Sequence, residues 1–238
     1  MTQSKPEHFL RREVKYRLNS EMFEILKREF AAHVVQDKFH FVCVHNIYYD
    51  NDSHEIIRRS IEKPLFKQKL RLRAYEKNGE LDGHAFVEMK NKYEGSVFKR
   101  RVKIPIGAAR LLADGTPLCG VIASGQIADE LLFYAGAKDC RPKIYVSYNR
   151  YAYCAKAEKD LRITFDFGIF SRVERLWLCR DSADEQLLTD DDYILEIKSE
   201  RPFPLWLTGI LAKHRLYPQS FSKYGRIYEE SLRTAANI

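Results

Sequence analysis

The sequence has no hydrophobic run near the length of about 20 residues that a membrane-spanning helix needs. Residues 1–15 are polar and lack the apolar core of a secretion signal. No glycine-rich phosphate loop follows an expected strand, and the five cysteines show no C-x-x-C spacing. These absences argue against a membrane segment in this chain and against a nucleotide-binding glycine loop. They predict a cytoplasmic protein with reduced thiols.

What the sequence does have is an excess of positive charge. Its 238 residues include 40 Lys and Arg against 33 Asp and Glu, a net charge of +7. The hydrophobic content of 45% is that of an ordinary globular protein, and no repeat or low-complexity linker divides the chain. We therefore expect one domain over residues 1–238, with acidic partners such as nucleic acid, anionic lipid or a phosphate ligand.

Strand-like segments outnumber helical ones along the chain. An Asn78-Gly79 turn predicts a hairpin, and Ser20 is the expected N-cap of the first helix. The pattern predicts an α+β fold of eight or more antiparallel strands with helices outside, as a closed barrel or a strongly curved sheet. The expected strands are 11–18, 39–50, 67–76, 85–92, 96–104, 143–155, 161–167 and 193–198, and the expected helices are 20–33, 106–113, 124–134, 202–216 and one within 221–233.

Five of these strands place charged or polar groups two residues apart. Residues i and i+2 of a strand share one face, so each segment combines an ionic face with an apolar one. If the sheet closes, the ionic face lines a channel. The segments are Glu13-Val14-Lys15, Arg71-Leu72-Arg73, Glu88-Met89-Lys90, Arg162-Ile163-Thr164-Phe165-Asp166 and Glu196-Ile197-Lys198.

A sheet with one solvated face would also alternate in this way, and that reading is the favoured one for any single segment. The charges of the whole set favour a binding face instead. Setting aside its ten bases and four acids leaves 30 bases and 29 acids in the rest of the chain, so the face carries nearly all the excess charge. Ten cations with few carboxylates gain most from a polyanion. The bases are Lys15, Arg71, Arg73, Lys90, Lys99, Arg101, Arg150, Arg162, Lys198 and Lys223, and the acids are Glu13, Glu88, Asp166 and Glu196.

The ordered segments resemble the triphosphate tunnel metalloenzymes (the CYTH-like superfamily), and within them the catalytic domain of the vacuolar transporter chaperone (VTC) polyphosphate polymerases. The resemblance spans roughly residues 9–230. It rests on the five segments above together with Tyr48-Tyr49-Asp50, Ser96-Val97-Phe98-Lys99-Arg100-Arg101, Tyr148-Asn149-Arg150-Tyr151 and Phe221-Ser222-Lys223-Tyr224.

The resemblance implies a closed eight-stranded antiparallel tunnel that holds phosphates with the help of a divalent metal, Mn²⁺ or Mg²⁺. Glu196 resembles the family's principal metal ligand, with Glu13, Glu88 and Asp166 as helpers. The implied phosphate contacts are the ten bases together with Ser222. The implied catalytic residues are Lys15, Arg71, Arg73, Lys90, Arg150, Arg162 and Lys198.

Three functions follow as hypotheses. The first is a polyphosphate polymerase-like enzyme that transfers the γ-phosphoryl group of ATP to a growing chain. The second is a tunnel triphosphatase acting on inorganic triphosphate or a nucleoside triphosphate. The third is a non-catalytic module that binds polyphosphate or nucleic acid, although the carboxylates argue against pure binding and no nucleic-acid partner is expected. The sequence does not specify the oligomeric state.

The spacing of the histidines does not support a zinc centre. His40, His45 and His54 lie close together in the sequence, but their spacing is irregular for zinc ligands. We expect surface or core roles for all three.

Overall fold

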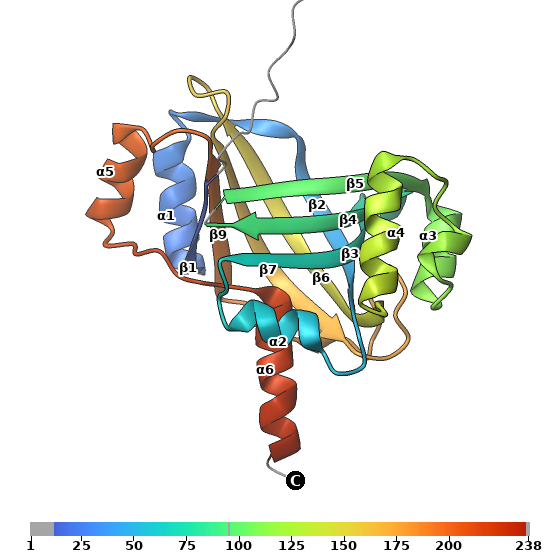
Figure 1. Cartoon of the computed structure of the whole chain (residues 1–238). Helices are drawn as coiled ribbons and strands as arrows, with labels where there is room; N and C mark the ends of the chain where they lie inside the picture. Colours follow the sequence, from blue (N-terminus) through green and yellow to red (C-terminus); the bar gives the residue numbers. More distant parts are fainter. Residues whose placement is uncertain (1–11, 95, 237–238) are drawn as a thin grey trace, which may run out of the picture.

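The computed structural model describes residues 12–94 and 96–236, whose strands form one curved antiparallel sheet (Figure 1). In space the order is β1-β9-β7-β6-β2-β3-β4-β5, with the short β8 paired to β7. The strands are β1 (Arg12–Asn19), β2 (Val34–Asp50), β3 (Phe66–Lys77), β4 (Glu80–Tyr93), β5 (Ser96–Pro105), β6 (Arg141–Ala155), β7 (Arg162–Arg172), β8 (Glu185–Gln186) and β9 (Asp192–Ser199).

The expected α+β class is confirmed, but a closed tunnel is not. Within the described ranges, β1 and β5 are the two edges of the sheet and no backbone ladder joins them. The two edges nevertheless approach each other, because the sheet curls around its inner face. The structure therefore shows an open sheet whose edge strands lie close together.

The hairpin predicted at Asn78-Gly79 joins β3 to β4. Asn78 has a φ of 54° and Gly79 a φ of 82°, so both turn residues are left-handed. Two-residue turns of this kind match the twist of antiparallel strands, and the Asn-Gly pair adopts them at low energetic cost. A β-bulge between Ala74 and Glu76 then shifts the register, so that Arg71 lies opposite Glu88.

Two groups of helices cover the outer face of the sheet (Figure 1). Helices α1 (Ser20–Phe30) and α5 (Leu205–Lys213) pack on β1, β9 and β7. Helices α3 (Ile106–Ala113) and α4 (Gln126–Ala137) pack on β3, β4 and β5, with the short 3-10 helix η1 (Leu118–Gly120) between them in the chain. The apolar residues between the charged ones pack under these helices, where Leu72 and Ile197 are fully buried and Val14 is partly buried.

The expected N-cap at Ser20 is wrong by one position. Asn19 caps α1, because its side chain accepts a hydrogen bond of 2.9 Å from the backbone N–H of Met22. Ser20 is the first helical residue, and its hydroxyl donates to the carboxylate of Asp191 instead. An asparagine at the end of a strand caps as well as a serine, so the two adjacent candidates were equivalent in the sequence.

One end of the inner face is covered by α2 (Glu55–Ile61) and α6 (Lys223–Ala236). Helix α2 was not expected, because its single apolar pair, Ile56-Ile57, gives almost no periodicity over seven residues. Asp50 holds its start by accepting hydrogen bonds of 2.9 Å from the N–H groups of both isoleucines. Tyr224 of α6 donates to the same carboxylate at 2.9 Å, which ties the two helices together.

Other boundaries differ by a few residues. β2 begins at Val34 rather than at residue 39, and the helix expected over 202–216 is confined to 205–213. The acidic segment 182–192, which lies between two expected strands, contains the two-residue β8. In the part of the chain that the structure describes, no helix combines the length and the apolar character that a membrane crossing requires.

Candidate active site

The inner face of the sheet holds a cavity of about 290 Å³ whose wall is mostly basic. Ten of the predicted site residues line it: Glu13, Lys15, Arg71, Arg73, Lys90, Arg150, Glu196, Lys198, Ser222 and Lys223. They come from β1, β3, β4, β6 and β9 and from the start of α6, so segments from both ends of the described chain meet there. Seven of these ten come from the segments that the i, i+2 alternation selects, all but Arg150, Ser222 and Lys223.

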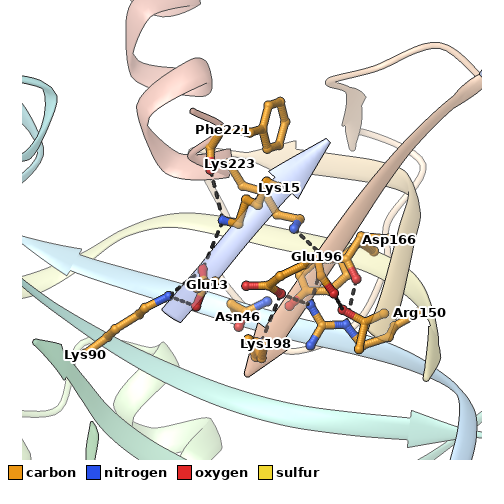
Figure 2. A network of polar contacts seen from close by, with 12 residues as sticks. Glu13, Lys15, Asn46, Lys90, Arg150, Asp166, Glu196, Lys198, Phe221 and Lys223 are labelled. Carbon is orange, nitrogen blue, oxygen red and sulfur yellow. Dashed lines mark hydrogen bonds and ion pairs between the residues drawn. The ribbon is translucent and has the colours of Figure 1, made fainter. Parts of the chain in front are cut away.

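The centre of the wall carries two carboxylates on neighbouring strands, Glu13 of β1 and Glu196 of β9 (Figure 2). Glu196 lies 3.0 Å from Lys198 and 3.3 Å from Arg150, whereas Glu13 lies 2.8 Å from Lys90 and 3.3 Å from Lys15. The two carboxyl groups are also close enough to interact with each other. Like charges at such short range need compensation from nearby cations.

The cations supply that compensation. Burial would raise the pKa of Glu196, but Lys198, Lys15 and Arg150 outweigh it and hold the pKa well below its usual range. For Glu13, burial and the neighbouring Glu196 both act to raise the pKa, and Lys90 and Lys15 outweigh them. Both carboxylates are therefore ionised at neutral pH.

Asp166 and Glu88 lie behind the wall and hold its arginines. Asp166 accepts two hydrogen bonds from Arg150, at 2.6 and 2.8 Å, and one from Lys223 at 2.6 Å. Burial opposes its ionisation, but these two cations lower the pKa of Asp166 to about 2. The structure thus assigns Asp166 a positioning role for an arginine and a lysine that face the cavity.

Glu88 has the same arrangement on the other side of the cavity. It is fully buried, and it accepts hydrogen bonds of 2.8 and 3.0 Å from Arg71 and one of 2.9 Å from Lys99. Burial acts to raise its pKa, but Arg71, Arg73 and Lys99 together hold the pKa of this carboxyl far below its usual range. Lys99 thereby lies behind the wall rather than in it.

Two further predicted phosphate contacts point elsewhere. Arg101 is exposed, with its guanidinium 4.7 Å from the ring centre of Phe86. Arg162 is the first residue of β7, and its side chain is 54% exposed and lies 3.4 Å from Asp37. Arg100 does face outward, as the alternation predicts, and pairs with Glu130 of α4 at 3.1 Å. Arg162 thus leaves the cavity at the end of its strand, whereas Arg101 leaves it from the middle of β5.

The cavity also contains residues that the sequence reasoning missed, above all Lys69. Its ammonium group donates a hydrogen bond of 3.0 Å to the hydroxyl of Ser222. Burial, together with Lys67, Lys90 and Lys15, lowers the pKa of Lys69 to about 7. The same i, i+2 alternation that selects the arginines at 71 and 73 would have found it.

Tyr48, Tyr148 and Asn46 are a second missed group. Asn46 accepts a hydrogen bond of 2.8 Å from Arg73, and the hydroxyl of Tyr148 accepts one of 3.1 Å from the same guanidinium. Burial opposes ionisation of Tyr48, but Arg71, Arg73 and Lys223 outweigh it and lower the pKa of its hydroxyl. These uncharged groups hold the guanidinium groups of Arg71 and Arg73 in place on the inner face.

Solved structures with the same fold are known. The chain is similar to the PH1819 protein of Pyrococcus horikoshii OT3 over 92% of this chain and 99% of that one, with a TM-score of 0.50 and 16% identity. It is similar to a candidate adenylate cyclase of Bacillus halodurans over 90% of this chain and 95% of that one, with a TM-score of 0.53 and 15% identity. At such identities the likeness shows the fold alone.

The sequence itself shows the family. A family model for the VTC domain matches residues 10–231, and the chain therefore belongs to the VTC domain family. Among curated proteins, none matches the sequence. This match confirms the family resemblance that the strand motifs show.

The donor set fits a small divalent cation. Mg²⁺ and Mn²⁺ prefer oxygen ligands, and Mg²⁺ commonly binds through one or two carboxylates together with substrate phosphates. Glu13 and Glu196 offer two ionised carboxylates side by side at the cavity wall. Their mutual repulsion and their exposure to the cavity suit them to hold such an ion against a bound phosphate chain.

Proposed function

We propose that this protein is a metal-dependent polyphosphate polymerase-like enzyme that uses ATP. The observation that carries the proposal is the pair of ionised carboxylates, Glu13 and Glu196, side by side in a cavity wall whose charged groups are mostly Lys and Arg. A site for passive polyanion binding would gain nothing from two acids at its centre. A site that binds phosphates through a metal needs both.

The guanidinium groups of Arg71, Arg73 and Arg150 grip the nonbridging oxygens of the phosphates. Their geometry is set before substrate arrives, since Glu88, Asn46 and Asp166 already hold them by hydrogen bonds. Preorganised charge of this kind supplies most of the catalysis in phosphoryl transfer.

The lysines act as point charges around the chain. Lys15, Lys90, Lys198 and Lys223 line the cavity and surround the carboxylate pair. Their charges neutralise those that develop on the oxygens of the transferring group.

The transfer itself is a displacement at the γ-phosphorus of ATP. A terminal oxygen of the growing polyphosphate forms the new P–O bond, the bond from the γ-phosphorus to the β,γ-bridging oxygen breaks, and ADP leaves. Glu196 and Glu13 would hold the divalent metal, which supplies charge neutralisation across the reacting phosphates. Water in place of the chain end would give the triphosphatase reaction.

The test is incubation of the purified protein with ATP and Mn²⁺, followed by a gel for polyphosphate and an assay for free phosphate. We expect chains that lengthen with time and ADP in proportion to the phosphate incorporated. Free phosphate without chains would replace the proposal with the triphosphatase. Tight triphosphate binding without either product would leave the binding module. A matched control is the exposed-site variant Arg175→Gln, whose side chain lies outside the cavity lining.

A further inference from the structure

A second cluster of ligand-type side chains lies on the opposite face of β2 and β3 from the cavity. Cys43 and His45 are two residues apart on β2, and Glu76 of β3 lies opposite Cys43 in the register. One atom each from the thiol, the imidazole and the carboxylate lie within 4.8 Å of one another. From the sequence we expect a surface or core role for His45 because the histidine spacing is irregular, and Glu76 lies on another strand, 31 residues further along the chain.

The imidazole of His45 is held by both of its nitrogens. Nδ1 lies 2.7 Å from the hydroxyl of Tyr145, and Nε2 lies 3.0 Å from the carboxylate of Glu76. Bonds of about 2.0–2.1 Å to a tetrahedral metal place two ligand atoms roughly 3.3 Å apart. The Nε2 and carboxylate atoms are therefore already near the separation that a shared metal requires, while Tyr145 orients the ring from behind.

We propose that Cys43, His45 and Glu76 form a zinc site separate from the phosphate cavity. A thiolate, an imidazole and a carboxylate are ligands that Zn²⁺ accepts together, whereas Mg²⁺ and Mn²⁺ favour oxygen donors. Solvent would complete the tetrahedron. The Glu76 side chain is 28% exposed and gives the ion its route of entry, whereas His45 is fully buried.

The charges around the cluster are consistent with such an ion. A thiolate and a carboxylate neutralise Zn²⁺, so the guanidinium of Arg180, which contacts Cys43, faces a centre without net charge. Arg172, the other cation near His45, is already paired with Asp184 at 2.5 Å.

Binding must displace the thiol proton to solvent. Burial raises the pKa of the Cys43 thiol to about 11, so the metal-free cluster holds a thiol rather than a thiolate. One proton is therefore released for each ion bound.

The test uses the whole purified protein, stripped of metal by a chelator and titrated with Zn²⁺ and with Co²⁺ as a spectroscopic substitute. We expect one equivalent of Co²⁺ to give thiolate-to-metal absorption and the d–d bands of a four-coordinate ion. Cys43→Ser should abolish the thiolate band. Glu76→Gln should weaken Zn²⁺ binding at least about tenfold, as loss of a carboxylate near the ion would. The control is Cys119→Ser, which removes an exposed thiol in η1.

Failure is equally clear. A thiolate band that survives Cys43→Ser but is lost in Cys119→Ser would overturn the proposal. So would a Zn²⁺ affinity of the unsubstituted protein that is no higher than the Zn²⁺ affinity of Glu76→Gln. Should Cys43→Ser not fold, the partly exposed Glu76→Gln decides the outcome, with circular dichroism as the check on its fold. Triphosphate binding should be unchanged in Glu76→Gln, which separates this site from the cavity.

Discussion

Lys90 of β4 lies 2.8 Å from Glu13 of β1, and this ion pair crosses the seam between the two edges of the sheet. Among the described residues no backbone hydrogen bonds pair β1 with β5 across the seam, so contacts between side chains connect the two edges. The same pair lies beside Glu196 in the wall of the cavity. The contact across the seam and the proposed metal-binding acids thus belong to one network. A single substitution in this network should therefore affect both.

Glu196→Gln should abolish metal-dependent turnover of ATP and yet leave metal-free binding of tripolyphosphate equal or tighter. The substitution removes one of the carboxylates that pair with Lys198, Lys15 and Arg150, so these cations have one competitor fewer when phosphates bind. Calorimetry without metal and an assay of ADP formation with Mn²⁺ measure the two effects separately. Activity that survives in this variant would show that the metal assignment is wrong. The exposed Glu200→Gln serves as the control.

Arg71→Ala should lower the free energy of unfolding by about 3 kcal/mol, since it removes the main partner of a fully buried carboxylate. Adding Glu88→Gln should recover part of that loss, with a coupling of about 1–3 kcal/mol in the double-mutant cycle. Urea denaturation without ligand gives all four values. Strictly additive effects would mean that the pair contributes nothing as a pair.

Lys69 should make stability depend on pH in a defined window. Its pKa in the folded protein is about 7, against an ordinary lysine pKa of 10.5, so between these limits the unfolded chain binds more protons. Stability from this group therefore rises as the pH increases from 7 toward 10.5. Lys69→Met should remove that rise, whereas Lys92→Gln, another lysine of the cavity wall, should retain it. Urea unfolding at a series of pH values shows whether the two curves diverge.

Tyr224→Phe should lower the free energy of unfolding by about 1–2 kcal/mol, because it leaves buried Asp50 without one of its hydrogen-bond donors. Tyr228→Phe in the same helix should change stability by less than about 0.5 kcal/mol. Thermal or urea unfolding compares the two. Equal losses in both variants would show that the hydroxyl of Tyr224 has no special role.

Lys198→Gln should weaken tripolyphosphate binding about tenfold, the value of one charge-assisted hydrogen bond. Arg162→Gln should leave the affinity within about twofold, since its guanidinium pairs with Asp37 rather than facing the cavity. Titration calorimetry at one fixed salt concentration measures both. A comparable loss in Arg162→Gln would restore it to the phosphate contacts that the family resemblance implies.

The local sequence pattern predicted the strands and their two faces, but it did not predict the contacts between residues far apart in the sequence. The alternation at Arg71-Leu72-Arg73 gives the strand and its two faces, because side-chain direction in a strand depends only on position. The Asn78-Gly79 turn gives the neighbouring strand, although a β-bulge between Ala74 and Glu76 shifts the register beyond the turn. These two local rules were enough to place the arginines on the inner face.

The pattern did not predict which carboxylate forms an ion pair with which cation. Glu88 and Asp166 were grouped with Glu196 as metal ligands, yet each is turned toward an arginine opposite it in the register. Arg162 obeys the alternation but lies at a strand end, where the side chain can leave the face. Burial and pairing depend on strands distant in sequence, and the spacing of residues within one strand carries no information about them.

The start of α6 has a consequence for when the protein becomes competent during its synthesis. The backbone oxygen of Phe221 accepts a hydrogen bond from Lys15, and Lys223 pairs with Asp166, so one side of the cavity consists of chain made some 200 residues after the first strand. A nascent chain lacking this segment has the curved sheet but not the complete wall. The proposed substrates thus meet a complete cavity wall only after α6 has been synthesised and has docked.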